Sequence, residues 1–485
     1  MSLIDPLFIN LLKRFSPDDI SEFLRQYSEH GKIGTLFCTF WTGTEIVDDH
    51  LRFVDLPTLV FGRDIFGKKS LCYRIRGSLI ECKRIPGEIN SGWRDVPQGT
   101  VVILRSLEMT RNGIILAQPD AALHLQFGFK DLWQAQAYVF SFIRNDAVNL
   151  FIERLKNSVR DVSFYRIPGG DSLLELNTEL FPQEDIEEMK KNSVNEFIKL
   201  FETILPLRYL PAKPETLLFL FSGGVDSLFV TLIAAMVANE DFEFVLVNVS
   251  FSESGADFEA APDRKRGLEA YEFLKGKFPE RTFNFLRVNV TKDELQKKRA
   301  SIIGSVVAPG STVLDDSIGC VVWFACRAKG IQDGLETRYD HVERVFVGSG
   351  SDEILGGYSR HRGIFEREGY GELFNELRSE IQNIGNRNLG RDDRVALSNG
   401  RMMLAPFIDE DIVRFINLLP IQLKVDFSLP RGIGEKIILR EALKQLGAPE
   451  TLYTAPKKAM QFGTRIAKLE NRSEKGSDQC VRLMA

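Results

Sequence analysis

The chain contains few of the residues that build metal centres or disulfide frameworks. Its 485 residues include six cysteines, none of them in a C-x-x-C pair, and five scattered histidines. A structural zinc site is therefore not expected. Such sparse cysteines fit a reducing compartment, and no signal-peptide pattern is visible at the start of the chain. We therefore expect a cytoplasmic protein.

Long apolar runs and an excess of basic residues are also missing. The longest apolar runs, such as 228–238, are far too short to span a membrane. The net charge of −5 does not favour a general nucleic-acid binder. The expected partners are therefore small molecules, with no nucleic acid and no membrane, while homodimerisation stays open. A length of 485 residues is too great for one core and predicts two or three domains.

The most informative stretch that is present is an apolar run at 217–221 followed by SGGVDS at 222–227 and a second apolar run. This pattern predicts a buried strand, a tight loop and a helix packed on a sheet. The glycines let the backbone approach a ligand closely, and serine hydroxyls and helix amides can hold phosphate oxygens. The candidate phosphate-binding residues are Ser222, Gly223, Gly224 and Ser227.

Asp226 adds a carboxylate to this expected anion site. An acid there makes sense if a metal ion bridges it to a pyrophosphate. The loop is not a Walker loop, because no Gly-Lys-Ser/Thr follows at the required spacing. The alternative is a glycine turn in an ordinary strand–helix unit, but the flanking Ser and Asp-Ser make that interpretation the weaker one.

Strand-like and helix-like segments alternate from residue 217 onward. The expected strands are 217–221, 244–249, 283–290 and 345–347, and the expected helices are 228–238, 264–277 and 317–329. This alternation predicts an α/β fold with a doubly wound parallel sheet, whose ligands bind at the carboxyl ends of the strands. The remainder, 365–485, is expected to be mainly helical.

Residues 1–150 have the pattern of an α+β domain. A helix is expected within 1–30, and glycine-punctuated strands at 35–41, 58–61, 70–75, 78–83 and 100–104. Residues 151–212 contain several prolines and glycines and are interpreted as a connector with one helix at 182–204.

A second glycine-rich loop, GSGSDEILGGY at 348–358, follows the expected strand at 345–347. Asp352 and Glu353 fall in the first turn of the helix that it opens. Alone, the motif is equally well explained as a capped helix. Together with SGGVDS on another strand of the same sheet, it predicts a shared nucleotide site to which Val347 and Gly348 present backbone.

These motifs resemble those of the N-type ATP pyrophosphatases, and of the asparagine synthetases in particular. SGGVDS resembles their pyrophosphate loop, and 348–358 resembles the signature Ser-Gly-Glu-Gly-Ser-Asp-Glu-x-x-Gly-Gly-Tyr. Further likenesses follow in chain order: LDDSIG at 314–319, Arg391 with Asp393, APFID at 405–409 and PKKAMQFG at 456–463. The subgroup that is most similar is the asparagine synthetase domain-containing proteins of animals and fungi, through YSRHR at 358–362, RNLGRDDR at 387–394 and LPRGIGEK at 429–436.

The N-terminal part resembles a class II glutamine amidotransferase domain, which has an Ntn hydrolase-type fold. FGRDIFGKKSL at 61–71 is similar to its Arg-Asp-x-x-Gly hairpin, and WRDVPQG at 93–99 to the turn that follows. The resemblance therefore implies three parts. Residues 1–150 form a truncated amidotransferase-like domain, 151–212 a connector, and 213–485 the synthetase domain.

The resemblance implies an ATP-dependent ligase that uses Mg²⁺ and adenylates the aspartate side chain, releasing AMP and pyrophosphate. Asp226 and Asp352 would hold the metal, and Lys457, or as the weaker alternative Lys458, would neutralise charge that develops on phosphorus. The implied catalytic residues are Lys457, Asp226, Asp352 and Glu353, and the implied substrate-binding residues are Asp316, Ser317, Arg391 and Asp393. Outside this context, Lys457 and Lys458 are explained as a solvated charge pair.

Two departures from the family pattern limit these expectations. An active glutaminase of this class uses an N-terminal cysteine, whereas this chain begins Met-Ser and has Cys38 inside an expected strand. We therefore expect ammonia, rather than glutamine, as its nitrogen source. Ser349 stands where the family has a glutamate that takes a proton from ammonia, and serine is no base near neutral pH. Two alternatives stay open: a non-catalytic ATP-binding paralogue acting through a partner, and an adenylating ligase with another substrate.

Overall fold

The computed structural model describes residues 16–29, 37–41, 44–47, 50–53, 58–76, 79–87, 92–105, 124–128, 133, 135–141, 143, 145–167, 174–470 and 474–483. The chain forms two compact units. The first comprises 1–174 and 382–394, and the second comprises 175–381 and 395–485. Within the described residues, no helix is long and apolar enough to cross a membrane.

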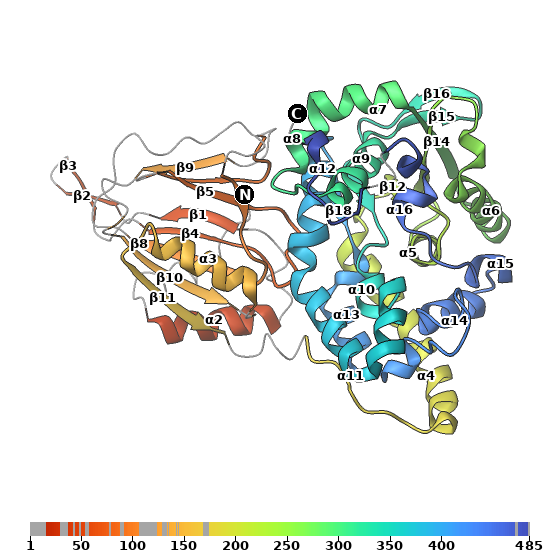
Figure 1. Ribbon diagram of the computed structural model, residues 1–485, viewed down its shortest axis with the longest axis horizontal. Helices are drawn as coiled ribbons and strands as arrows, with labels where there is room; N and C mark the ends of the chain where they lie inside the picture. The colour runs from red at the N-terminus through yellow and green to blue at the C-terminus, as the bar shows by residue number, and fades with distance from the viewer. Residues whose placement is uncertain are drawn as a thin grey trace. The chain divides into compact units, whose positions relative to one another are not determined.

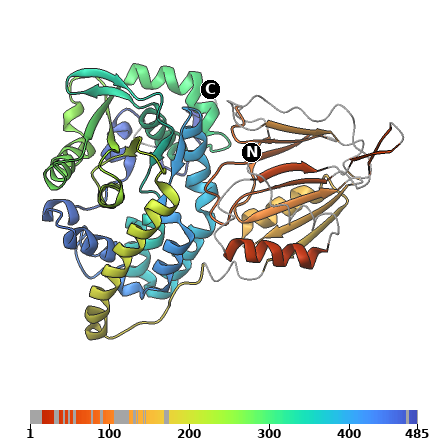
Figure 2. The same cartoon turned by 180° about the vertical axis from the view of Figure 1, so that it is seen from behind.

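The predicted boundaries at residues 150 and 212 need correction. Strand β11 (Asp161–Arg166) pairs in parallel with β10 (Gln136–Ser141), so the first unit continues past residue 150. Helix α4 (Gln183–Ile204) packs against α5 (Val225–Val237) and α14 (Ile437–Gln445) of the second unit; Figure 2 shows it from behind. Residues 151–212 are thus divided between the units and form no separate connector.

The first unit is built mainly from antiparallel sheet (Figure 1). Its five-stranded sheet has the order β1-β4-β8-β10-β11 and its four-stranded sheet the order β7-β5-β6-β9. Besides β10 and β11, its elements are α2 (Pro17–Glu29), β1 (Phe37–Trp41), β2 (Thr44–Val47), β3 (His50–Phe53), β4 (Thr58–Gly62), β5 (Cys72–Arg76), β6 (Leu79–Lys83), β7 (Arg94–Asp95), β8 (Thr100–Arg105), β9 (His124–Gly128) and α3 (Asp146–Lys156). The five predicted strands are confirmed, and so is the N-terminal helix from residue 17; residues 1–15 lie outside the described ranges.

One hydrophobic core joins the two sheets of the first unit. Phe61 of β4 and Val102 of β8 come from the five-stranded sheet, and Tyr73 of β5 and Ile80 of β6 from the four-stranded one. Helix α3 adds Phe151, whose ring meets that of Tyr73 edge-on at 4.9 Å between centroids. An α+β unit with two sheets over a shared core is the result.

The second unit contains the predicted α/β sheet. After α4, β12 (Thr216–Leu220) and α5, its further elements are β13 (Glu243–Ser252), α6 (Pro262–Lys277), β14 (Phe283–Thr291), α7 (Lys292–Lys298), α8 (Gly304–Val307), α9 (Val313–Arg327), β15 (Lys329–Gln332), β16 (Leu335–Arg338), β17 (Arg344–Phe346), α10 (Ser351–Leu355), α11 (Ser359–Ile384), α12 (Gly390–Leu397), β18 (Met402–Leu404), α13 (Glu410–Leu418), α14, α15 (Glu450–Tyr453) and α16 (Met460–Gly463). The first five residues of α12 belong to the first unit. All four predicted strands and all three predicted helices of the sheet region are confirmed, with small shifts at their ends.

The order of the strands places a binding site at one point of the sheet. The sheet runs β16-β15-β14-β13-β12-β17-β18, and β14 through β18 in this order are parallel. From β12 the chain adds β13 and β14 on one side, and it later adds β17 and β18 on the other side. The point between β12 and β17 is therefore the topological switch point of a doubly wound sheet. The SGGVDS loop follows β12 and the GSGSDE loop follows β17, so both motifs lie at the switch point.

Helices cover both faces of this sheet. Asn248 and Phe251 of β13 are three positions apart and so face opposite sides. Asn248 Oδ1 accepts a hydrogen bond from Nε of Arg264 in α6 at 2.8 Å. The Phe251 ring meets Phe324 of α9 at 5.9 Å between centroids. Strands β12 and β13 are buried along most of their length because both of their faces are covered, whereas β14 alternates buried and half-buried residues.

Candidate functional site

The two glycine-rich loops approach each other closely at the switch point. A Cβ on Gly348 would lie 2.7 Å from Cβ of Asp226, so only glycine fits there. Gly223 has a φ of +71°, and a Cβ on it would lie 2.5 Å from the carbonyl carbon of Arg266. The two glycines thus allow α5, α6 and the loop before α10 to converge, while the predicted approach of this backbone to a ligand stays a prediction.

The serines of SGGVDS shape the loop itself. The Gly224 amide donates to Ser222 Oγ, and Ser227 Oγ donates to the Gly224 carbonyl oxygen, both at 3.2 Å. The two hydroxyl oxygens lie 3.4 Å apart. Because α5 begins at Val225, both hydroxyls gather at a helix N-terminus, where the helix dipole favours an anion.

Two carboxylates and two lysines meet beside this loop; we call Asp226, Asp352, Lys436 and Lys457 the acid–lysine cluster. Lys436 Nζ lies 2.6 Å from Asp226 Oδ1, 2.7 Å from Asp352 Oδ1 and 3.1 Å from Ser351 Oγ. Lys457 Nζ contacts the other oxygen of Asp352, Oδ2. The predicted residues Asp226, Asp352 and Lys457 are therefore brought together.

Lys436 is the residue of this cluster that was not predicted. It precedes α14 with a φ of +56°, and its side chain is 1% exposed. In the sequence it is the last residue of the LPRGIGEK motif at 429–436. Nothing in that motif shows that a lysine side chain will be buried between two acids, because the contact joins positions 210 and 84 residues away in sequence.

Burial and pairing together fix the charges of the cluster. Burial opposes the ionised form of Asp352, but Lys436 and Lys457 hold the pKa of its carboxyl well below the usual range. Burial likewise opposes the ammonium of Lys436, but Asp226 and Asp352 raise its pKa above the ordinary value. Asp352 and Lys436 are therefore both ionised at neutral pH.

Glu353 differs from its neighbour Asp352. Burial and the nearby Asp352 charge raise the pKa of Glu353 above its ordinary value. Its Oε1 accepts a hydrogen bond of 2.7 Å from the Tyr358 hydroxyl. The predicted catalytic position is thus a buried carboxyl group that accepts a hydrogen bond from Tyr358.

The acid–lysine cluster fits a divalent cation. Two carboxylates supply hard oxygen ligands of the kind that Mg²⁺ prefers, together with phosphate oxygens. The Asp226 side chain is 23% exposed, and its Oδ2 accepts no hydrogen bond from the described part of the chain. Asp226 would hold such an ion through Oδ2, and Asp352 would join it in exchange for one of its lysine contacts, because both of its oxygens pair with lysines here.

Asp316 and Ser317 belong to a different group of side chains. Asp316 is fully buried and paired with Arg299 Nε at 2.8 Å and Arg482 Nε at 3.1 Å. Ser317 Oγ donates to Glu470 Oε2 at 2.8 Å. No contact joins these residues to the acid–lysine cluster among the described residues, and their role in substrate binding stays a prediction.

Arg391 and Asp393 lie in the first unit. Asp393 accepts hydrogen bonds from the Ser70 amide at 2.9 Å and from Arg84 at 2.8 Å. Although burial opposes it, Lys69 and Arg84 hold the pKa of Asp393 below its ordinary value. Arg391 Nε donates to Asp392 Oδ1 at 2.8 Å. The Arg-x-Asp pair thus contributes to the structure of the first unit, and its predicted substrate contact stays a prediction.

The geometry described so far defines an α/β unit with a phosphate-type loop and paired carboxylates at its switch point. A family model described as asparagine synthase matches residues 365–475. Asparagine synthetase domain-containing protein 1 of Mus musculus is 34% identical over 499 residues, covering 88% of this chain and 79% of the mouse protein. The Homo sapiens protein of that name is 40% identical over 304 residues, covering 54% of this chain and 47% of its own length.

The chain therefore belongs to the family of asparagine synthetase domain-containing proteins. A shorter similarity reaches a putative glutamine-hydrolyzing asparagine synthetase of Methanocaldococcus jannaschii, 31% identical over 152 residues, or 26% of this chain and 28% of that one. The resemblance deduced from the motifs is thus confirmed.

Removal of the Lys436 charge should strongly destabilise the second unit. Lys436→Met leaves Asp226 and Asp352 without their buried cation, and breaking such a pair costs about 3–5 kcal/mol. We expect this loss in the free energy of unfolding, measured by urea denaturation at pH 7. Lys444→Met, at a side chain 58% exposed, is the control and should cost less than about 1 kcal/mol. Equal losses in the two variants would contradict a buried ion pair at Lys436.

Asp263 should give the stability a distinct pH dependence. It lies in the first turn of α6, 5% exposed, and its carboxylate faces Gly463. Burial raises its pKa from 3.8 to about 7, although the nearby charges of Arg266, Lys458 and Lys457 lower it. Between about pH 4 and pH 7 the folded chain therefore binds more protons than the unfolded chain, so this group lowers stability as pH rises.

Asp263→Asn removes that titration. We expect the free energy of unfolding of the variant to exceed that of wild type by about 1–4 kcal/mol at pH 8 and by clearly less at pH 4.5. This difference follows from about 1.4 kcal/mol for each unit by which the pKa is raised. Urea denaturation at both pH values measures the difference. Asp241→Asn, in an exposed turn before β13, is the control and should change stability equally at both. A pH-independent effect of Asp263→Asn would contradict the raised pKa.

Proposed function

We propose that this chain is an ATP-dependent amide ligase that adenylates a carboxylate, with the side chain of aspartate as its substrate and ammonia as its nitrogen donor. The observation that carries this proposal is the meeting of Asp226, Asp352, Lys436 and Lys457 beside the SGGVDS loop. Family membership supports an activity of the ligase class. The acid, the amine and the cytoplasmic location are part of the proposal.

The proposed reaction has two steps. A carboxylate oxygen of the substrate attacks the α phosphorus of ATP, the bond to the β phosphate breaks, and pyrophosphate leaves. The nitrogen of ammonia then attacks the acyl carbon, and AMP leaves. Ser222, Ser227 and the amides of the SGGVDS loop bind the leaving pyrophosphate.

The charged residues of the site act on the developing charges. Lys457 stabilises negative charge on the phosphorus oxygens and then on the tetrahedral intermediate. Mg²⁺ held by Asp226 and Asp352 would neutralise the pyrophosphate when bound. The chain offers no glutamate at position 349 to take the proton of ammonia, so we expect the second step to be slow.

The first unit supports a glutamine amidotransferase-like fold. A five-stranded and a four-stranded sheet share one core with α3, and the Arg63–Asp64 hairpin follows β4. The thiol of Cys72 is buried beside Ser70, Asp95 and Arg394, and burial and the charge of Asp95 raise its pKa to about 12. Such a thiol is a poor nucleophile at neutral pH. We therefore propose that this chain does not hydrolyse glutamine.

A non-catalytic ATP-binding protein is the second candidate. Ser349 favours it, because loss of a general base removes on the order of 10²–10⁴-fold in rate. A third candidate is a ligase that adenylates another acid. The assembled acid–lysine cluster favours catalysis over the second candidate, since buried paired charges are expensive to keep without a use.

One product assay separates these candidates. Purified chain is incubated with ATP, Mg²⁺, aspartate and either ammonium or glutamine, and AMP, pyrophosphate, asparagine and glutamate are measured together. The proposal predicts asparagine equal to AMP with ammonium, and no glutamate from glutamine. AMP without asparagine would indicate another substrate, and the absence of both would favour the non-catalytic protein.

Asp226→Ala should reduce conversion of ATP to AMP to background, because it removes one of the two carboxylates that hold the metal–pyrophosphate complex. Lys68→Ala, in the first unit, should leave the rate within about twofold. Equal activity of Asp226→Ala and wild type would refute the assignment of the site. Urea denaturation of Asp226→Ala should show that the variant remains folded under the assay conditions.

A further inference from the structure

Tyr358 connects the acid–lysine cluster to the start of α11. It is the first residue of the YSRHR motif, which the proposed reaction does not use. Its hydroxyl donates to Glu353, as described above, and Lys457 Nζ lies 4.5 Å from the centroid of its ring. A cation at this distance from an aromatic ring is attracted to it. One side chain therefore contacts two of the predicted catalytic residues.

Arg360 approaches the same ring. Its Cζ lies 4.2 Å from the Tyr358 centroid. Its guanidinium pairs with Glu376, at 3.1 Å from Nε to Oε1, and with Glu380. Two cations can meet one tyrosine because each also has a carboxylate: Asp352 for Lys457, and the two glutamates for Arg360.

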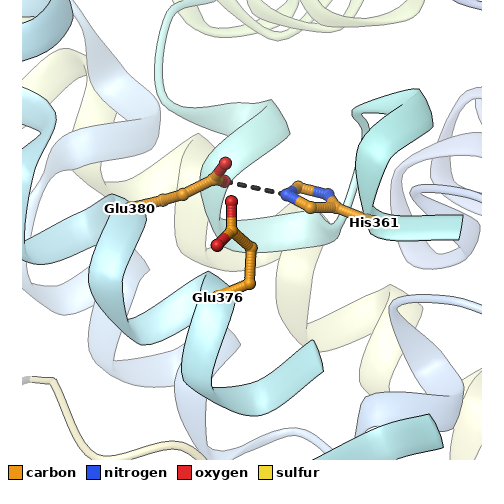
Figure 3. Close-up of side chains that lie close together, drawn as sticks. All are labelled: His361, Glu376 and Glu380. Atoms are coloured by element: carbon orange, nitrogen blue, oxygen red, sulfur yellow. Dashed lines mark hydrogen bonds and ion pairs between the residues drawn. The ribbon is translucent and has the colours of Figure 1, made fainter. Parts of the chain in front are cut away.

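His361 fixes the backbone of Tyr358 to the second half of α11 (Figure 3). Nδ1 of His361 accepts the Tyr358 amide proton at 3.3 Å, and Nε2 lies 2.9 Å from Glu380 Oε2. Burial, and then the charge of Arg360, lower the pKa of His361 to about 4, so the ring is neutral at physiological pH. Since Nδ1 accepts, Nε2 carries the proton and donates it to Glu380.

A break in α11 brings these residues face to face. Gly369 has a φ of 75° inside the helix, so the segments before and after it are two helices joined by a kink. His361 lies in the first and Glu380 in the second, and both are buried, with exposed fractions of 0% and 1%. The bonds between them are therefore protected from water.

The side chains of His361, Glu376 and Glu380 are grouped as in a metal site. Ligand atoms of His361, Glu376 and Glu380 lie within 4.8 Å of one another. Two contacts oppose a metal there. Nε2 carries a proton in this tautomer and has no free lone pair, and Arg360 already brings positive charge to both glutamates. The group therefore serves to hold Arg360 and Tyr358 in place.

Lys457 depends on such side-chain contacts. It lies in the segment 455–459, which is neither helix nor strand, so its backbone alone does not fix the ammonium. That ammonium contacts Asp352 and the Tyr358 ring. In the proposed function Asp352 also binds the cation that accompanies ATP. The Tyr358 ring is then the contact that stays with Lys457.

We propose that Tyr358, held by Arg360 and His361, is a positioning residue that keeps the Lys457 ammonium in place while Asp352 binds the nucleotide-associated cation. This inference rests on the proposed role of Lys457. Its test therefore starts with a measurement that needs no turnover.

The measurement is the rate at which acetic anhydride acylates Lys457 in the full chain, read by fragmentation mass spectrometry. The neighbouring Lys458 serves as an internal reference for general loosening of the loop. We expect Tyr358→Leu to raise the ratio of Lys457 to Lys458 acylation about 2- to 10-fold, the range that a cation–π contact supplies. Tyr358→Phe keeps the ring and should stay within about twofold of wild type.

Substitution of Arg360 provides a second test that leaves the Tyr358 side chain unchanged. Arg360→Gln should raise the ratio by about half as much as Tyr358→Leu, and Arg360→Lys should restore it, because cation–π attraction is retained. Arg367→Gln, at a side chain 64% exposed on the same helix, is the matched control and should have no effect. An unchanged ratio in both Tyr358→Leu and Arg360→Gln would overturn the proposal.

The labelling is then repeated with Mg²⁺ and α,β-methylene-ATP, which cannot be cleaved to AMP. The proposal predicts a larger difference between Tyr358→Leu and wild type than without nucleotide, since Asp352 no longer shares Lys457. A smaller difference would overturn the proposal that Asp352 leaves Lys457 to bind the nucleotide-associated cation. If the nucleotide does not bind at the acid–lysine cluster, it has no effect on either protein, yet the nucleotide-free difference remains. If only the ligase activity fails, the product assay is negative while both labelling differences remain. Where AMP formation is measurable, Tyr358→Leu should lower kcat about 10-fold and leave KM for ATP within about twofold.

Discussion

The site depends on one buried ammonium group. The Lys436 side chain lies between Asp226 at the start of α5 and Asp352 in α10, and Lys436 directly precedes α14. Without that charge the two carboxylates would repel each other at a site that is largely shielded from water on the side of Lys436. The cation therefore allows the loops after β12 and β17 to approach as closely as Gly348 and Asp226 do.

From this ion pair the rest of the site can be followed outward. Lys457 adds the second positive charge on Asp352, and Tyr358 contacts both Lys457 and Glu353. Arg360 contacts the Tyr358 ring from the first segment of the kinked α11 and pairs with Glu376 and Glu380 of the second segment. In the proposed function the acid–lysine cluster is the reacting group, and Tyr358, Arg360 and His361 support it.

Much of the fold could be predicted because its elements have strong local patterns. The strands of the second unit are short apolar runs bounded by glycine or polar residues, and their alternation with helices indicated a parallel sheet. Strands β10 and β11 were missed. Much of β11 is only half buried, so it lacks a continuous apolar run, and its place in the sheet comes from pairing with β10. The assignment of residues 382–394 to the first unit was missed as well, because ion pairs such as Asp393 with Arg84 join positions 309 residues apart.

The sequence by itself determined which chemistry is available: a phosphate loop, two acids and a lysine, with serine at position 349. These are properties of residue types in short motifs, and a motif carries them wherever it lies. Only the tertiary structure decided how the charges combine. The pairing of Lys436 with two acids, the contact of Lys457 with the Tyr358 ring and the pairing of Asp316 with Arg482 all join residues distant in sequence. Such contacts depend on where the sheet and its helices place the backbone, and no local pattern specifies that.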